Sequence, residues 1–217
     1  MDNYEDLVYN FLLSEFEGNK FAVCGIMGNL KAESNLNPVN LQNSYEKIFG
    51  MTDVEYTEAV SKGDYTRDQF INDHAGYGFC QWTYWSRKQG LYDYCFANSH
   101  SGYIYNVKIG DPILQLEYMM IELKQNKSLY NKLLTCEDIA DAAEWFCLEF
   151  EKPAGGEKSV PKRIDYALDY WNRLANNDTT IELKAENEFL KESLKNICDK
   201  LDQIYIVVKE RYDGRTK

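Results

Sequence analysis

Hydrophobic residues recur every three or four positions along most of the chain, which is the spacing of amphipathic helices. Pro112 suits the first turn of a helix, and Thr135 with Asp138 resembles an N-terminal capping box. The pattern predicts helices over residues 4–16, 21–33, 86–96, 112–123, 139–150 and 163–174. We therefore expect a mainly α-helical body that ends near residue 175.

The predicted helix over residues 21–33 carries small residues on neighbouring faces, namely Ala22, Gly25, Gly28 and Ala32. Residues three and four positions apart lie side by side on a helix, so these positions let another element approach the helix backbone closely. The sequence therefore predicts a buried central helix.

Residues 35–75 are polar and are interrupted by Asn, Asp, Gly and Pro, which predicts loops, short helices or a small hairpin. Thr66 or Asp68 is expected to cap a turn that leads to Phe70 and Ile71. The expected fold is thus mainly α, with a small irregular or β region.

A polar break at residues 176–182 predicts a linker between the body, residues 1–175, and a helix over residues 183–212. The helix has the a/d spacing of a coiled coil, and Asn187 at an a position favours a defined register. We expect a homo-oligomer through residues 183–208, with the alternative that a long helix folds back on the body. The seam consists of Leu183, Asn187, Leu190, Leu194, Ile197, Leu201, Ile204 and Val208.

The formal net charge of -11 argues against a nucleic-acid partner, because clustered Lys and Arg hold a phosphate backbone and no basic run is present. No apolar run is long enough to span a membrane, and the acidic N-terminus does not resemble a signal peptide. The six cysteines and two histidines lack metal-ligand spacing. We expect reduced cysteines, no metal site and no cofactor.

Glu33 lies at the C-terminal end of the predicted central helix. Residues 34–38, which end in Pro38, follow it and terminate the helix. The partial negative charge of a helix C-terminus and burial both disfavour an ionised carboxylate. A carboxyl group that keeps its proton near neutral pH can protonate a glycosidic oxygen. Glu33 is therefore a candidate general acid.

Three further sequence features stand out: residues 31–38 (Lys-Ala-Glu-Ser-Asn-Leu-Asn-Pro), residues 76–83 (Gly-Tyr-Gly-Phe-Cys-Gln-Trp-Thr), and residues 150–154 with Arg163. Together they resemble motifs of the phage tail lysozyme family, which includes tail-tip proteins and endolysins. The first segment resembles the catalytic-glutamate motif of this family, the second is similar to its Gly-x-x-Gln turn, and the third resembles its late region. The resemblance covers roughly residues 5–175 and implies a lysozyme-like fold with Glu33 as the catalytic residue.

The resemblance implies a sugar-binding groove, which needs amide side chains and aromatic platforms for hydroxyls, acetamides and flat sugar faces. The candidate platforms are the rings of Tyr77, Trp82, Tyr84 and Trp85, and we expect about half of these rings to be buried instead. A second catalytic carboxylate is left open among Glu46, Asp53, Glu55, Glu58, Asp64, Asp68, Asp73 and Glu151, or is absent. The expected substrate-binding residues are Ser34, Tyr77, Gln81, Trp82, Tyr84 and Glu151.

The resemblance implies a muramidase that hydrolyses the β-1,4 bond between N-acetylmuramic acid and N-acetylglucosamine in bacterial peptidoglycan. The alternatives are a lytic transglycosylase and a catalytically silent wall-binding or assembly protein. Such an enzyme without a signal peptide is expected in the host cytoplasm until a holin releases it, or in the virion tail.

Overall fold

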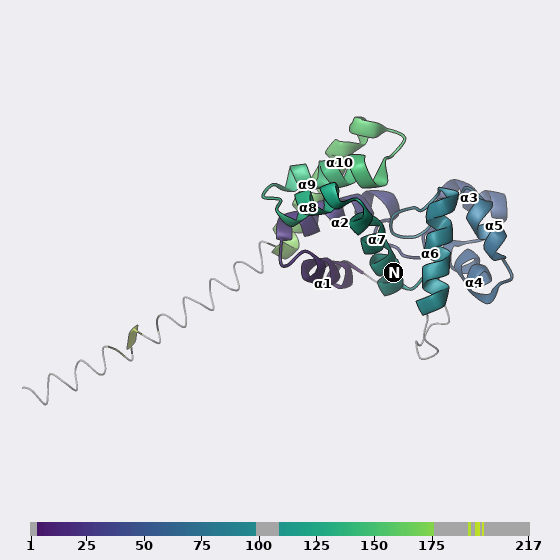
Figure 1. Cartoon of the computed structure of the whole chain (residues 1–217), viewed down its shortest axis with the longest axis horizontal. Coiled ribbons are helices and arrows are strands. Elements are labelled where there is room, and N and C mark those ends of the chain that lie inside the picture. Colours follow the sequence, from purple (N-terminus) through teal and green to yellow (C-terminus); the bar gives the residue numbers. More distant parts are fainter. Residues whose placement is uncertain (1–3, 99–108, 176–190, 192–193, 196, 198–217) are drawn as a thin grey trace, which may run out of the picture. The chain divides into compact units, whose positions relative to one another are not determined.

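The computed structural model describes residues 4–98 and 109–175, together with Lys191, Leu194, Lys195 and Ile197. This part of the chain is mainly α-helical, as predicted (Figure 1). A π-helical segment, Phe146–Glu151, follows α9, and a second one, Trp171–Ala175, follows α10. The helices are α1 (Glu5–Glu15), α2 (Lys20–Ser34), α3 (Asn43–Phe49), α4 (Asp53–Lys62), α5 (Arg67–Asn72), α6 (Trp85–Asn98), α7 (Pro112–Gln125), α8 (Lys127–Leu134), α9 (Ile139–Trp145) and α10 (Val160–Tyr170).

Residues up to Trp171 belong to one compact unit. The predicted linker and most of the predicted coiled coil lie outside the described residues. Leu194 and Ile197, two positions of the predicted seam, are helical, and their side chains are exposed.

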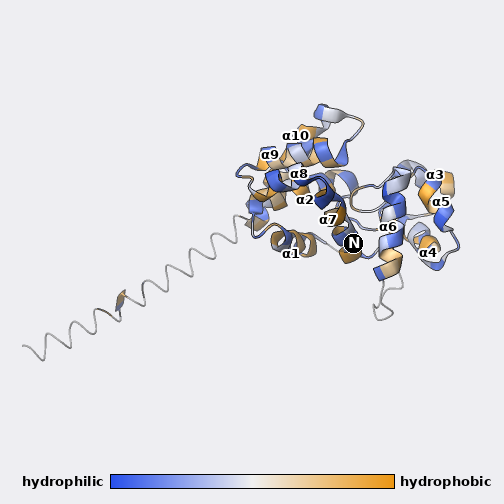
Figure 2. Cartoon of the chain, viewed as in Figure 1, coloured by the Kyte–Doolittle hydropathy of each residue, from blue (hydrophilic) through white to orange (hydrophobic). Residues whose placement is uncertain are grey.

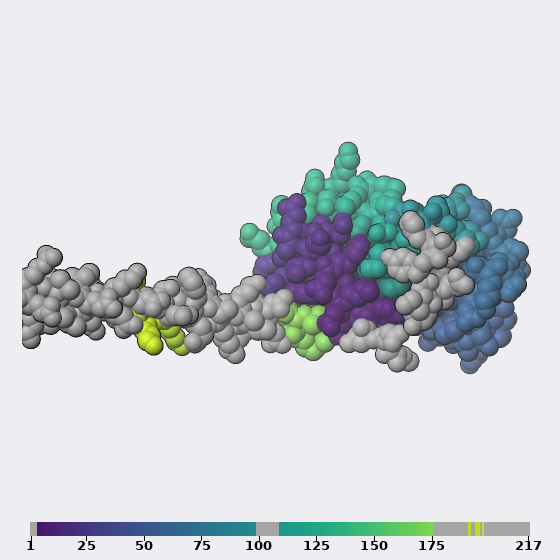
Figure 3. All heavy atoms as spheres, turned by 90° about the horizontal axis from the view of Figure 1, so that it is seen from below, coloured from purple at the N-terminus to yellow at the C-terminus, as the bar shows by residue number. Residues whose placement is uncertain are grey.

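Asn19 is the N-cap of α2, and its side chain forms hydrogen bonds with the ends of two helices. Its Oδ1 accepts hydrogen bonds from the backbone N–H groups of Phe21 and Ala22. Its Nδ2 donates to the carbonyl oxygens of Leu133 and Leu134 at the end of α8, at 3.3 and 3.0 Å. One half-buried amide thus satisfies backbone groups that both helices leave free. In Figure 3 the purple N-terminal helices lie against the teal later part of the chain.

Two glycines of α2 let neighbouring helices reach its backbone. A Cβ atom on Gly25 would lie 2.6 Å from the Cβ of Ala142 in α9, and one on Gly28 would lie 2.4 Å from the carbonyl oxygen of Arg163 in α10. Ile26 and Met27 of α2 are fully buried. The prediction of a buried central helix is confirmed.

The polar segment after α2 forms three short helices, α3, α4 and α5, which gather beside α6 in Figure 1. Thr52 and Thr66 each form a capping box, with Glu55 and Gln69 respectively, so the predicted cap at Thr66 is confirmed. In the described residues the expected β region is limited to isolated bridges between Tyr77 and its partners in residues 41 and 82.

The capping box predicted at Thr135 is wrong, because this residue ends a helix. Thr135 is the C-cap of α8, a short helix that the hydrophobic pattern does not separate from its neighbours. Asp138 alone caps α9, and its Oδ1 accepts hydrogen bonds from the N–H groups of Ala140 and Asp141. In Figure 2, hydrophobic and hydrophilic residues alternate along α10, as the pattern requires of a helix with one buried face.

A buried ion pair anchors the chain just before the segment that resembles the Gly-x-x-Gln turn. The Nζ of Lys88 on α6 lies 2.5 Å from Oδ1 of Asp73, and the two side chains are 0% and 3% exposed. Lys88 also donates to the carbonyl oxygen of Ala75, and the hydroxyl of Tyr56 donates to Asp73. Burial lowers the pKa of Lys88 to about 8, against the opposing effect of Asp73. The loop is thus fixed from the interior.

We predict that Gly28→Ala lowers the free energy of unfolding by about 1–3 kcal/mol, because the added methyl group pushes α10 away from α2. Chemical denaturation measures the change. Ser128→Ala, on the exposed face of α8, is the control and should change stability by less than about 0.5 kcal/mol. Equal stability of Gly28→Ala and the wild type would contradict the close packing.

Candidate active site

The three motif segments meet around one cavity of about 530 Å³. Glu33 reaches it from the end of α2, where Asn35 and Leu36 adopt left-handed backbone conformations (φ 57° and 56°) that terminate the helix. The cavity is lined by Glu33, Gln42, Cys80, Gln81, Thr83, Tyr84, Arg87, Glu151, Lys152, Pro153 and Ala154. Predicted site residues from all three motifs therefore share one cavity.

Glu33 forms an ion pair with Arg163 of α10. The side chains are 19% and 8% exposed, so water screens the pair weakly. Nη1 of Arg163 donates to the carbonyl oxygen of Ser159 at 3.0 Å, which holds the guanidinium in place. The tertiary structure thus places beside Glu33 a cation that the sequence alone does not indicate.

Glu151 lines the same cavity from the end of the π-helical segment Phe146–Glu151. Its Oε1 is buried and has no hydrogen-bond partner. Burial raises the pKa of Glu151 to about 8, and the charge of Glu33 adds to the rise, against the lowering effects of Arg87, Arg163 and the Cys80 thiol. Glu151 therefore keeps its proton near neutral pH.

The backbone is strained on both sides of the cavity. Gln81 and Lys152 adopt positive φ values of 45° and 52°, in the left-handed region that non-glycine residues rarely occupy. Lys152 ends the π-helical segment, and its N–H donates to the carbonyl oxygen of Cys147. Such strain and π-helical turns concentrate at functional sites.

The second motif forms a tight turn around Gly78 and Gln81. The N–H of Gln81 donates to the carbonyl oxygen of Gly78, and its side-chain Nε2 donates to the carbonyl oxygens of Asn40 and Gly78, each at 3.1 Å. Gln115 supports the turn from the interior, because its Oε1 accepts the N–H of Phe79. The Gln81 side chain thus lines the cavity and also holds the turn closed.

Three of the residues expected to bind sugar, Ser34, Tyr77 and Trp82, do not line the cavity, so their assignment needs correction. Tyr77 and Trp82 are fully buried, with hydrogen bonds to the hydroxyl of Thr57 and to Glu122. Ser34 is buried, and its Oγ donates to the backbone carbonyl oxygens of residues 30 and 79. These side chains join elements of the interior and leave no surface for a glycan.

Two aromatic residues of the same region are exposed. Tyr84 is 63% exposed and lines the cavity, and the neighbouring Trp85 is 49% exposed. With Tyr77 and Trp82 buried, the expectation that about half of these rings are structural is confirmed.

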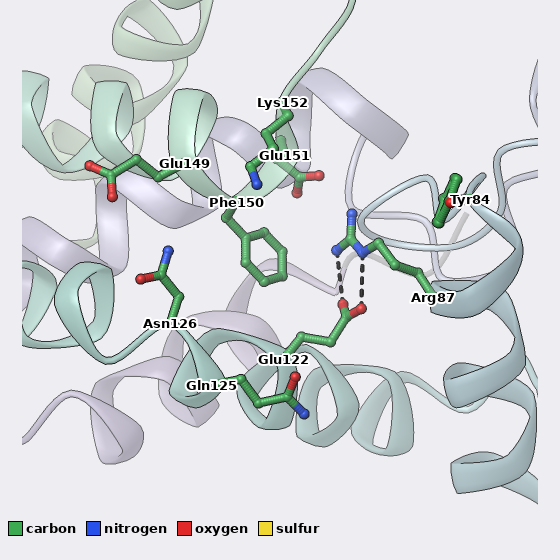
Figure 4. Close-up of a pocket in the computed structure, with 9 residues that line it drawn as sticks. All are labelled: Tyr84, Arg87, Glu122, Gln125, Asn126, Glu149, Phe150, Glu151 and Lys152. Carbon is green, nitrogen blue, oxygen red and sulfur yellow. Dashed lines mark hydrogen bonds and ion pairs between the residues drawn. The ribbon is translucent and has the colours of Figure 1, made fainter.

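A second hollow of about 740 Å³ adjoins the first and shares four of its residues, Tyr84, Arg87, Glu151 and Lys152. Figure 4 shows Arg87 on its wall, joined to Glu122 of α7 by two hydrogen bonds of 2.9 and 2.8 Å. The guanidinium of Arg87 also lies 4.9 Å from the centre of the Phe150 ring. The remaining lining residues are Glu122, Gln125, Asn126, Glu149 and Phe150.

Arg87 and Glu122 are absent from the residues predicted from sequence, whereas Lys152 lies in the third motif segment but is not among the expected site residues. From sequence alone, a charged residue that forms an ion pair in a groove cannot be told apart from one that is solvated on the surface. The partner of Arg87 lies on a different helix, 35 positions away along the chain. Only the tertiary contact identifies them.

The acidic residues between the first two motifs line neither hollow. Asp53 accepts hydrogen bonds from Asn37 and from the N–H of Leu41, and Asp73 pairs with buried Lys88. Of the eight candidates for a second carboxylate, Glu151 shares the cavity of Glu33.

In the described ranges, no group of three or more His, Cys, Asp or Glu residues is arranged to hold a metal ion. The cysteines at positions 24, 80, 95, 136 and 147 are free and buried, and Cys198 lies outside the described residues. None of the described helices combines the length and apolarity needed to cross a bilayer.

Residues 3–174 match the phage tail lysozyme family, and the chain belongs to this family. Family membership indicates a lysozyme-like, peptidoglycan-degrading activity at the bacterial cell wall. No curated protein and no solved structure matches the chain.

We predict that Gln81→Ala lowers turnover substantially and lowers the free energy of unfolding by about 1–3 kcal/mol, because two hydrogen bonds to the turn are lost. Peptidoglycan digestion and denaturant unfolding measure the two effects. Gln125→Ala, which removes an exposed amide, is the control for stability. Near-normal activity together with a large loss of stability would make Gln81 a purely structural residue.

Proposed function

We propose that the protein is a muramidase that hydrolyses the β-1,4 bond between N-acetylmuramic acid and N-acetylglucosamine. The observation that supports this most strongly is the pair of carboxyl groups, Glu33 and Glu151, in one cavity. Their surroundings differ, because Arg163 contacts Glu33, whereas the Oε1 atom of Glu151 is buried without a hydrogen-bond partner. Glycoside hydrolysis generally uses one protonated and one ionised carboxyl group.

The shape and lining of the two hollows suit a glycan strand. They share one wall, so several sugar rings can occupy them in sequence. Tyr84 offers an exposed ring for a flat sugar face, and the amide oxygen of Gln81, whose Nε2 holds the turn, offers an acceptor for a sugar hydroxyl or acetamide. The formal charge of -11 repels anionic wall polymers at long range, so short-range contacts in these hollows supply the affinity.

Hydrolysis is favoured over transglycosylation by the presence of a second carboxyl group. A lytic transglycosylase needs one glutamate, which acts as acid and then as base while a hydroxyl group of the muramic acid attacks. Hydrolysis adds water, for which a second carboxyl group is the usual base or nucleophile. Mass spectrometry of the products separates the two reactions, since hydrolysis leaves reducing ends and transglycosylation leaves anhydro ends.

We predict that Glu33→Gln reduces lysis of purified peptidoglycan to less than about a tenth of the wild-type rate, because the amide cannot exchange a proton with the substrate. Loss of turbidity measures the rate. Glu58→Gln, an exposed residue of α4 paired with Lys62, is the matched control and should retain wild-type activity.

A higher residual rate in Glu33→Gln would exclude Glu33 from the chemistry. A wild-type protein that binds peptidoglycan but leaves its bonds intact would instead support the silent wall-binding alternative.

We further propose that the enzyme reaches the wall either through holin-mediated release from the host cytoplasm or as part of the virion tail. Immunodetection in purified virions separates the two routes.

We also propose that residues 183–208 assemble the protein into a homo-oligomer. Leu194 and Ile197, at adjacent positions of the predicted seam, are 64% and 55% exposed, and pairing with a second copy buries them. The alternative, in which the helix folds back on its own domain, predicts a monomer.

We predict that truncation after Asn177 gives a monomer that still digests soluble glycan fragments and is less efficient on intact walls, where tethered sites act together. Light scattering measures the mass. Leu194→Asp with Ile197→Asp should dissociate the full chain, whereas the control Lys191→Ala with Lys195→Ala should leave the oligomer intact. A full-length monomer at micromolar concentration would contradict the oligomer.

A further inference from the structure

We propose that Arg163 is a positioning residue of the reaction, which holds the carboxyl of Glu33 in one orientation at the cavity. This inference rests on the proposed glycan-cleaving function, in which Glu33 takes part in the chemistry, and it gives that residue a supporting partner. Arg163 forms an ion pair with Glu33 but lines neither of the two hollows. It therefore acts on the substrate only through Glu33.

The carboxyl of Glu33 depends on Arg163 for its orientation. A glutamate side chain has three rotatable bonds, so a carboxyl that faces a cavity samples several rotamers unless a partner holds it. Glu33 lies in the last turn of α2 and lines the cavity, and its Oε1 accepts a hydrogen bond from Nη2 of Arg163. Within residues 4–98 and 109–175, this carboxyl accepts no other hydrogen bond.

Arg163 is itself held firmly. Its Nη1 donates to the carbonyl oxygen of Ser159 at 3.0 Å, and the residue is 6% exposed. Its backbone rests on α2, because a Cβ atom on Gly28 would lie 2.4 Å from the carbonyl oxygen of Arg163 and 2.7 Å from the backbone nitrogen of Ala167. The guanidinium thus has a fixed position relative to the helix that carries Glu33.

Stability alone is a poor reason for an arginine at this position. Its Nε is buried and finds no acceptor among the protein groups, and a buried donor without a partner costs free energy. Transfer of a guanidinium from water into the protein interior costs more, and an ion pair does not always offset it. An uncharged side chain of similar length would avoid both costs. A residue that is unfavourable for stability is typical of a position kept for function.

The second arginine near the cavity has a different role. Arg87 donates two hydrogen bonds to Glu122, and it lines both hollows itself. Glu122 lines the larger hollow and not the cavity in which the three motif segments meet. Of the two arginines, Arg163 is therefore the one that contacts a carboxyl of that cavity.

The position of Arg163 indicates which kinetic constant its loss changes. Displacement of a catalytic group by about 1 Å can lower a rate by about 10²-fold, because the reacting atoms are no longer aligned. Since Arg163 lines neither hollow, its loss leaves the contacts with the substrate in place. We therefore expect kcat to fall and KM to change little.

Steady-state kinetics on soluble peptidoglycan fragments test the proposal. Arg163→Met, which keeps the length of the side chain but donates no hydrogen bond, should lower kcat by about 10–10²-fold and change KM by less than about threefold. Rates are expressed per folded molecule, with the folded fraction measured by denaturant unfolding. Arg67→Met is the matched control and should keep both constants, because Arg67 pairs with Asp93 outside both hollows.

The conservative variant separates positioning from packing. The ammonium of Arg163→Lys can donate to Glu33 but lacks the fork that joins Glu33 and Ser159, so its kcat should lie below wild type and at least about fivefold above that of Arg163→Met. A purely structural role predicts the same kcat per folded molecule for both variants and the wild type. If Arg163→Met does not fold, Arg163→Lys should still show a lower kcat than wild type at an unchanged KM.

The possible outcomes are distinct. A wild-type kcat per folded molecule in Arg163→Met, a loss confined to KM, or equal rates of the two variants would overturn the positioning role and leave the muramidase proposal standing. A wild-type protein that cleaves neither the fragments nor intact peptidoglycan would overturn the muramidase proposal and the positioning role with it.

Discussion

The carbonyl oxygen of Arg163 would lie 2.4 Å from a Cβ atom on Gly28, and this close contact between α2 and α10 determines where Arg163 and Glu33 meet. Glycine at this position lets the α10 backbone rest on α2 one turn before Glu33. The Arg163 side chain then reaches the carboxyl of Glu33 at the end of α2. Any larger residue would separate the helices and move the guanidinium from the carboxylate. The close packing thus stabilises the core and positions Arg163 beside Glu33.

The cavity walls are strained, and the surrounding structure keeps them in place. Gln81 and Lys152 both have positive φ values, which cost free energy at each position. Interior contacts offset this cost on the Gln81 side, where the buried Lys88–Asp73 pair holds the preceding segment and Gln115 holds the turn. Removal of one partner from such a buried pair leaves an uncompensated charge, so these contacts strongly specify one arrangement.

The two carboxyl groups that share the cavity, those of Glu33 and Glu151, have different neighbours. Arg163 forms an ion pair with Glu33, whereas Arg87 forms an ion pair with Glu122. Trp82 is fully buried and donates its indole N–H to the same Glu122. Trp82 of the second motif therefore has a structural role, because it donates to the carboxylate that pairs with Arg87.

The sequence by itself determined the helical architecture, the buried central helix, the family and the position of Glu33, because periodicity, small residues and helix-terminating residues act locally. It also indicated that only some aromatic rings in and just after the second motif are available to a substrate. Glu151 was one of eight candidates for a second catalytic carboxylate. The tertiary structure decided which rings are buried and which acidic residue joins Glu33. It also decided that Arg163 contacts one carboxyl and Arg87 pairs away from the other. Burial and charge pairing depend on residues up to 130 positions apart, and no local pattern encodes which of them meet.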